Sequence, residues 1–187
     1  MFRLLYDSGI EKSNCGVGFI TRKDGNQTHK LLEFGHEALC KVPHRGGMAS
    51  DGVGDGAGIS IDLSINFFEK LTKKKLKKGL FGVGNFFLPM DSRDKLAAER
   101  FVNTVLIDFE LKVVLERDLP VNEDCLTEIQ KASQLPIKQW IFLSEIKRTE
   151  KEFASSIYRA LLEIEKKAFT LTSLEGLYPL SMSSKMQ

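Results

Sequence analysis

The stretch that decides the fold is "SNCGVGFI", residues 13–20. A cysteine, Cys15, stands directly before a Gly-x-Gly pair, and an apolar run follows it. Val17, Phe19 and Ile20 are bulky residues that favour strands, so the stretch predicts a buried strand that begins at the cysteine. Cys15 could be a buried thiol, a metal ligand or a nucleophile, and the surrounding sequence has to decide between these roles.

The cysteine pattern argues against a metal centre. The chain has three cysteines, Cys15, Cys40 and Cys125, at wide spacings and without a C-x-x-C pair. Zinc sites and iron–sulfur clusters need clustered ligands, and His29 and His36 have no third ligand near them. The odd count also argues against a disulfide framework, so the sequence favours a reducing, cytoplasmic location.

Composition indicates a soluble globular chain. Its 187 residues are 42% hydrophobic and 28% charged, with a net charge of +2, which does not indicate a nucleic-acid partner. The lysine-rich run "KKKLKK" at residues 73–78 is typical of a solvated loop or helix end. The N-terminus is not a signal sequence, and the longest apolar run, residues 80–90, is too short to span a bilayer. We therefore expect no membrane segment.

The periodicity of apolar residues predicts mixed helices and strands. The expected helices cover residues 28–42, 92–109, 123–131 and 151–168, and the expected strands cover residues 15–20, 59–64, 81–88, 112–120, 139–145 and 169–174. Asp91 is placed to cap the second helix, which should bury Leu96, Phe101, Val105 and Phe109. This alternation predicts an α+β fold in which helices cover sheets.

A second glycine-rich segment, "HRGGMASDGVGDGAGISIDL", occupies residues 44–63. It is neither a dinucleotide fingerprint nor a Walker loop, because a strand rather than a helix should follow and no Lys-Ser/Thr pair is present. Its glycines would instead allow tight turns and close backbone approach. Arg45 beside them could bind a carboxylate with paired hydrogen bonds, or could tie the loop to a sheet.

Together these segments resemble a known family. The sequences "LYDSGIEKSNCGVGFI" (residues 5–20) and "HEALCKVPHRGGMASDGVGDGAGISIDL" (residues 36–63), followed by "NFF", "FGVGNFFLP", "ERDLPVNED" and "LPIKQWIF", resemble in order and spacing the N-terminal amidotransferase domain of the glutamate synthase large subunit. The resemblance implies part of a four-layer αββα Ntn-hydrolase (class II glutamine amidotransferase) fold. It divides the chain into a propeptide (1–14), a partial type-2 amidotransferase domain (15–174) and a divergent C-terminal tail (175–187).

The resemblance also implies a reaction. Removal of residues 1–14 would make Cys15 the N-terminal residue, and its free α-amino group would act as the base. The thiolate would attack the side-chain amide of glutamine, release ammonia and leave a thioester that water hydrolyses to glutamate. Arg45, Gly46, Asp51, Asp55 and Gly56 match family positions around the nucleophile, so they are the expected substrate-binding residues.

The sequence leaves open how this chain relates to a complete glutamate synthase. The family's FMN and iron–sulfur cluster belong to the full-length parent enzyme, so we expect no cofactor here. The His-Asn-Gly segment that supplies the family's oxyanion hole is not found in this sequence. The chain could therefore be part of a full synthase, one piece of a split enzyme completed by another polypeptide, or a catalytically inactive Ntn-like domain with a binding or regulatory role. The expected partners are glutamine and the remaining synthase domains.

Overall fold

The structure of the protein is a computed structural model, and it describes residues 17–41 and 56–187. The chain divides into two compact units, Met1–Ile59 and Ser60–Gln187. The predicted nucleophile and glycine-rich loop belong to the first unit. The second unit contains the sheet and its core.

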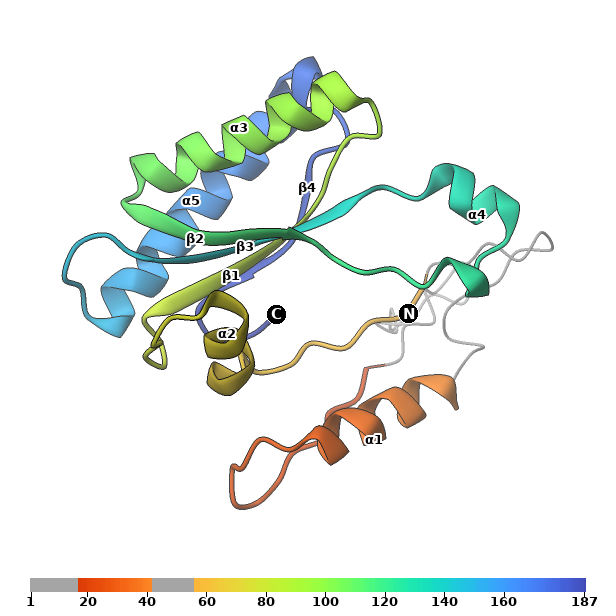
Figure 1. The fold of residues 1–187 in the computed structure, drawn as a ribbon, viewed down its shortest axis with the longest axis vertical. Coiled ribbons are helices and arrows are strands. Elements are labelled where there is room, and N and C mark those ends of the chain that lie inside the picture. The colour runs from red at the N-terminus through yellow and green to blue at the C-terminus, as the bar shows by residue number, and fades with distance from the viewer. Residues whose placement is uncertain (1–16, 42–55) are drawn as a thin grey trace, which may run out of the picture. The chain divides into compact units, whose positions relative to one another are not determined.

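The second unit is built on a four-stranded antiparallel sheet with the strand order β2–β3–β1–β4 (Figure 1). The strands are β1 (Phe81–Phe87), β2 (Leu111–Asp118), β3 (Ile137–Ser144) and β4 (Tyr178–Ser183). β1, β2 and β3 confirm three of the predicted strands. β4, which lies within residues 175–187, pairs with β1 and forms one edge of the sheet.

Two long helices cover one face of this sheet, α3 (Ser92–Asp108) and α5 (Glu150–Thr170) (Figure 1). Both were predicted from the sequence and both are capped. The carboxylate of Asp91 accepts hydrogen bonds from the backbone N–H groups of the first turn of α3. At α5, Thr149 and Glu152 form a reciprocal capping box, and the hydrogen bonds that Thr149 donates lower the pKa of Glu152.

The main core lies between these helices and the sheet. Trp140 of β3 is fully buried there, with its ring edge-on to Phe86 at 5.2 Å between centroids. Its Nε1–H donates to the side-chain oxygen of Asn103 on α3 at 3.2 Å. Trp140 therefore joins the middle of the sheet to α3 through both apolar packing and a polar contact.

A glycine in β1 lets α5 approach the sheet closely. A Cβ atom added at Gly82 would lie 2.3 Å from the ring of Phe142 and 3.0 Å from Ile157 of α5. No side chain fits in that space without displacing a buried neighbour. The position therefore requires glycine for packing between helix and sheet.

The opposite face of the sheet carries a second apolar cluster under a short helix, α2 (Ile65–Thr72). Phe68 of α2 packs with residues of the sheet and of the segment before α2, namely Leu63, Phe81, Val83 and Ile141. The sequence analysis did not predict α2. Beside it, residues 61–63 pair with residues 185–187, so the end of the described chain returns over this face.

Several sequence predictions are wrong in detail. The strand expected at 59–64 is reduced to a single bridge between Asp62 and Met186. The strand expected at 169–174 is replaced by the end of α5 and a 3-10 turn, because the N–H of Leu171 donates to the carbonyl of Lys167 and closes the helix. Leu96 of α3 is 46% exposed, since the buried stripe of that helix consists of Ala98, Val102, Val105 and Leu106.

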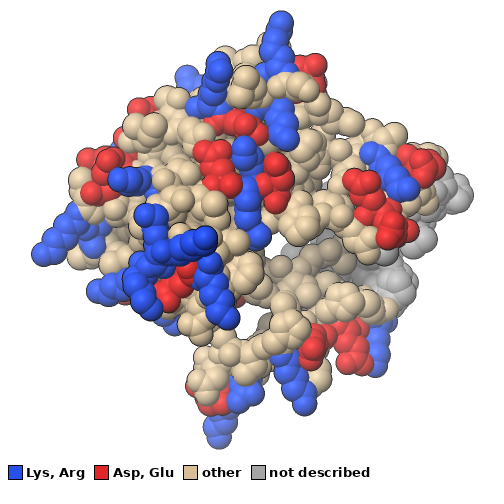
Figure 2. All heavy atoms as spheres, viewed as in Figure 1, with Lys and Arg blue, Asp and Glu red and all other residues tan. Residues whose placement is uncertain are grey.

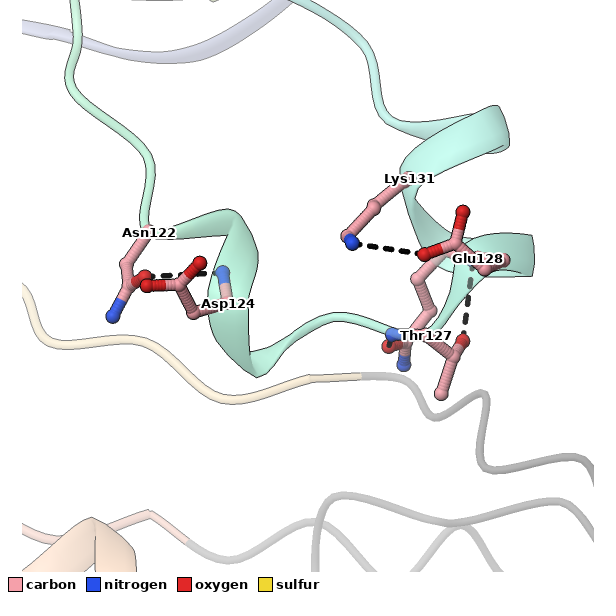
Figure 3. Close-up of polar contacts among 6 residues, drawn as sticks. Asn122, Asp124, Thr127, Glu128 and Lys131 are labelled. Atoms are coloured by element: carbon pink, nitrogen blue, oxygen red, sulfur yellow. Dashed lines mark hydrogen bonds and ion pairs between the residues drawn. The ribbon is translucent and has the colours of Figure 1, made fainter.

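The connection between β2 and β3 contains contacts between residues that are close in the sequence. It contains a 3-10 turn (Glu123–Cys125) and helix α4 (Glu128–Ser133), where a single helix was expected. Figure 3 shows Asn122 and Thr127 capping these two turns and Lys131 pairing with Glu128. The Lys131 Nζ and Glu128 Oε1 atoms are 2.9 Å apart. These contacts join residues two or three positions apart. They shape the connection itself and do not tie it to the sheet.

The lysine-rich run lies where the sequence placed it, in an exposed loop. Residues 73–78 follow α2, and Figure 2 shows Lys and Arg side chains gathered over α2 and this loop. Lys73 adopts a left-handed conformation that ends the helix, and the N–H of Leu76 donates to Glu69 at 2.9 Å. The loop is therefore anchored through Leu76 while its lysines face solvent.

The first unit contributes one described helix, α1 (His29–Cys40), which confirms the helix predicted at 28–42. None of its residues is buried. Residues 17–20, the described part of the strand expected at 15–20, have no regular secondary structure. Across the described ranges of both units, no helix is long and apolar enough to cross a bilayer.

Candidate functional site

Most of the predicted site residues fall outside the described residues. These are Cys15, Arg45, Gly46, Asp51 and Asp55. Their roles therefore stay predictions, as does the proposed propeptide at residues 1–14.

Gly56 is the one predicted site residue that the structure describes. Its φ angle is +79°, in the left-handed region that side-chain-bearing residues rarely adopt. A Cβ atom added there would meet nothing within 4 Å, so the backbone conformation and not crowding favours glycine. This supports the interpretation that glycines in this loop allow a tight turn.

The segment that follows Cys15 presents apolar side chains. Within the first unit, Val17 is 97% exposed and Phe19 is 92% exposed. Gly35 of α1 faces Ile59 of the same unit, where an added Cβ would lie 3.5 Å from the Ile59 side chain. The buried strand predicted here is therefore not observed in residues 17–20, and the apolar side chains after Cys15, the predicted nucleophile, are of a type suited to burial.

The histidines of α1 make only short-range contacts. His29 lies 3.2 Å from the carboxylate of Glu33, and His36 lies 3.9 Å from the Sγ atom of Cys40. Cys40 is a free, exposed thiol. In the parts of the chain that the structure describes, no three His, Cys, Asp or Glu side chains are grouped to hold a metal ion.

A row of polar side chains crosses all four strands on the face opposite α3 and α5. Nε of Arg117 (β2) donates to Gln139 (β3) at 2.8 Å, Gln139 donates to Asn85 (β1) at 2.8 Å, and Asn85 donates to Ser181 (β4) at 2.9 Å. Gln139 also donates to the side chain of Gln187 at 3.3 Å. Asn85 and Gln139 are 7% and 2% exposed, so the row is buried at its centre.

The arginine at the start of this polar row is partly withdrawn from water. Burial lowers the pKa of Arg117, and its guanidinium carbon lies 5.6 Å from the centre of the Phe67 ring on α2. That arrangement is a cation–π contact, which offsets part of the lost hydration. The aromatic ring and Gln139 together fix the guanidinium over the sheet.

The hydrogen bonds of the polar row hold its side chains in fixed orientations. None of these side chains gains or loses a proton near neutral pH. Its members are two amides, an arginine and a serine, and the Arg117 side chain stays charged at any ordinary pH. Each donor points from β2 toward β4, so the row fixes the relative register of the four strands. We conclude that the polar row is structural support for this face of the sheet.

The polar row was not predicted from the sequence, although a signal for it was present. Asn85 interrupts the otherwise apolar stretch "FGVGNFF", and Gln139 precedes "WIF" in β3. Buried amides within apolar strands need partners, so each suggests another polar group on a neighbouring strand. The register that pairs Asn85 with Gln139 depends on tertiary structure, which the periodicity of one strand does not reveal.

Replacing Gln139 with leucine should lower the free energy of unfolding by about 1–3 kcal/mol, because Asn85 and Arg117 would each lose a buried partner. Urea denaturation followed by circular dichroism measures this loss. In the double variant Asn85→Leu/Gln139→Leu, both amides are gone, so the loss should be smaller than the sum of the two single losses. Additive losses would contradict a coupled row.

Comparison with known proteins identifies the family. The sequence model described as "Glutamine amidotransferases class-II" matches residues 15–187. The chain is 33% identical to the glutamate synthase [NADPH] large chain of Bacillus subtilis and 32% identical to that of Azospirillum brasilense, over 97% and 96% of its length. It is 29% identical to the glutamate synthase [NADH] of Saccharomyces cerevisiae over 90% of its length. The chain spans 12%, 12% and 8% of these relatives, respectively.

Proposed function

Because the chain belongs to the class II glutamine amidotransferases, we propose that it provides the glutamine-hydrolysing part of a glutamate synthase, with Cys15 as the nucleophile. The observation that carries the proposal is the position at which the family match begins, residue 15. The first matched residue is the cysteine that the sequence analysis selects, and residues 1–14 lie outside the match. This boundary supports their removal as a propeptide.

The chemistry of an N-terminal cysteine suits this reaction. A thiol at neutral pH is mostly protonated, and its thiolate is the reactive form. A free α-amino group titrates at about 7.7–8.0 in model peptides, so it can take the thiol proton without a histidine. The thiolate then forms a bond to the side-chain carbonyl carbon of glutamine, and the C–N bond breaks as ammonia leaves. Water hydrolyses the resulting thioester to glutamate.

The remaining predicted site residues are proposed to bind the substrate. Arg45 can pair with a carboxylate through two parallel hydrogen bonds. Gly46, Asp51, Asp55 and Gly56 belong to the glycine-rich loop beside it, and the left-handed backbone at Gly56 supports a tight turn there. Asp51 and Asp55 offer carboxylates, which suit the α-amino group of glutamine.

The cofactors of a glutamate synthase are expected outside this chain. The chain's three cysteines, Cys15, Cys40 and Cys125, are widely spaced and include no C-x-x-C pair, whereas the ligands of iron–sulfur clusters are usually grouped in the sequence. The described residues also show no group of metal-binding side chains. We propose that the released ammonia passes to other synthase domains in a cytoplasmic enzyme.

Labelling with an electrophilic glutamine analogue, a diazoketone, tests the proposal. We expect the intact mass of the purified chain to correspond to a start at Cys15, and peptide mapping to find the label on that residue. Glutamine in excess should protect Cys15 from labelling. The matched control is Cys40→Ala, which removes an exposed thiol and should leave the protected label unchanged. A chain that retains Met1, or a label that glutamine does not protect, would contradict the proposal.

A further inference from the structure

Basic charge is concentrated at the end of α2 and in the loop that follows it. Residues 69–78, "EKLTKKKLKK", hold six lysines and one glutamate and carry a net charge of +5, whereas the whole chain carries +2. The rest of the chain therefore carries a net charge of −3. All six lysines are exposed, and Figure 2 shows Lys and Arg side chains gathered over this part of the molecule. We refer to residues 69–78 as the basic segment.

Few carboxylates lie close enough to neutralise the basic segment. Glu69 accepts a hydrogen bond from the N–H of Leu76 at 2.9 Å and pairs with Lys75 at 3.4 Å. Glu150 of α5 lies against Gly79, where an added Cβ would be 2.6 Å from its carboxylate. The other five lysines form no ion pair with any residue that the structure describes: Lys70, Lys73, Lys74, Lys77 and Lys78. The segment thus keeps an excess of positive charge.

The backbone of the basic segment is fixed by contacts with its surroundings. Lys73 is left-handed and ends α2, and Leu76 packs against the apolar cluster under that helix. The N–H of Leu80 donates to the carbonyl of Lys77 at 3.0 Å, which closes the turn before β1. The lysines repel one another at short range, and a negatively charged partner relieves this repulsion. Such a partner has to order only side chains, which lowers the entropic cost of binding.

The composition of the basic segment favours a protein partner over nucleic acid or a membrane. Residues 69–80 contain no arginine for paired hydrogen bonds to phosphates or bases, and no aromatic residue for base stacking. The ring of Phe67 on α2 already contacts the Arg117 guanidinium. Leu76, the apolar residue between the lysines, packs inward and does not project toward a bilayer. An extended polyanion would also meet the rest of the chain, whose net charge is negative.

We propose that the basic segment binds a carboxylate-rich segment of a partner protein. Lysine ammonium groups are point charges on flexible stems, so they pair with carboxylates without a fixed geometry. The attraction is screened beyond about 8 Å at physiological ionic strength, so the acidic segment has to lie directly on the lysines. The basic segment contains none of the residues proposed for glutamine hydrolysis. The contact therefore adds a binding function to the proposed reaction.

Fluorescence anisotropy of a labelled peptide of alternating Glu and Ser residues, titrated with the full 187-residue chain, tests this proposal. We expect saturable binding that weakens as salt is added. The same peptide with Gln in place of Glu should not bind. The triple variant Lys74→Glu/Lys77→Glu/Lys78→Glu should raise the dissociation constant at least roughly 30-fold, as expected when three exposed ion pairs are lost and replaced by repulsion.

A matched variant separates the basic segment from the net charge of the chain. Arg93→Glu/Arg100→Glu/Lys166→Glu makes the same change in charge at exposed positions on α3 and α5, which cover the other face of the sheet. It should change the dissociation constant less than about threefold, because these positions are screened from the peptide by salt. Circular dichroism verifies that both variants are folded.

Four results would overturn the proposal. The first is a chain that does not bind the acidic peptide, and the second is an equal loss of binding in the two triple variants. The third is tighter binding to vesicles of phosphatidylcholine and phosphatidylserine, or to a single-stranded oligonucleotide of the same charge as the peptide. The fourth is self-association in sedimentation velocity that the variant of the basic segment abolishes, because the partner would then be a second copy of this chain.

Discussion

Replacing Cys15 with alanine should lower the rate of ammonia release from glutamine by a factor on the order of 10⁴–10⁶, the range seen when other enzymes lose a nucleophile or its base. The reason is that the proposed thioester cannot form without the thiol. The measurement is a coupled assay of ammonia and glutamate in a chain that begins at Cys15. Glutamate and ammonia should appear in equal amounts, as hydrolysis requires.

The same assay tests the role of the Cys15 α-amino group separately from the role of the thiol. A chain that keeps residues 1–14 has no free amine at Cys15, so it should be inactive although the thiol is intact. Cys40→Ala serves as the control, because it removes an exposed thiol elsewhere in the first unit. Equal rates above the uncatalysed background for Cys15→Ala and the unchanged chain would show that another residue carries the reaction.

Replacing Trp140 with alanine should destabilise the second unit by about 3–5 kcal/mol, as is typical when a large buried aromatic residue is removed. Trp140 is fully buried against Phe86, and its N–H donates to Asn103. The variant therefore leaves a cavity and an unpaired amide oxygen together. Chemical denaturation followed by far-ultraviolet circular dichroism measures the change in the free energy of unfolding. Circular dichroism is used because Trp140 is the only tryptophan, so the variant has no tryptophan fluorescence.

Leu96→Ala is the matched control for this prediction. Helical periodicity assigns Leu96 to the core, but the structure leaves it 46% exposed. We expect its replacement to cost less than about 1 kcal/mol, since nearly half of the residue is already exposed to water. A similar loss for Leu96→Ala and Trp140→Ala would mean that the assignment of the core between α3 and the sheet is incorrect.

The elements with strong periodicity were predictable from the sequence. α3 and α5 are long helices with capping residues at Asp91 and Thr149, and local hydrogen bonds define where they start. β1 and β3 are apolar runs between turn residues, which identify buried strands. In these cases the local pattern and the tertiary environment favour the same structure.

The wrong predictions concern short segments whose conformation depends on distant contacts. The alternating pattern at 59–64 is typical of a strand, yet only Asp62 forms a bridge, with Met186 far along the chain. α2 has eight residues and follows directly after it, so the strand signal and the helix signal overlap. The polar row depends on strand register, and the role of Cys15 as the nucleophile was predicted only through the resemblance of the sequence to a family.

The strand order has a consequence for how the protein is made. β1 lies between β3 and β4 in the sheet, although it precedes both in the chain. At ribosomal speeds of about 5–20 residues per second, roughly 5–20 s separate the synthesis of β1 from that of β4, which begins about 100 residues later. During this interval the apolar stretch "FGVGNFF" is complete but lacks β4, and until residues 137–144 are made it lacks β3 as well. Formation of this four-stranded sheet is thus tied to β4, the last of its four strands to be synthesised, and β1 is the segment that a chaperone would have to protect.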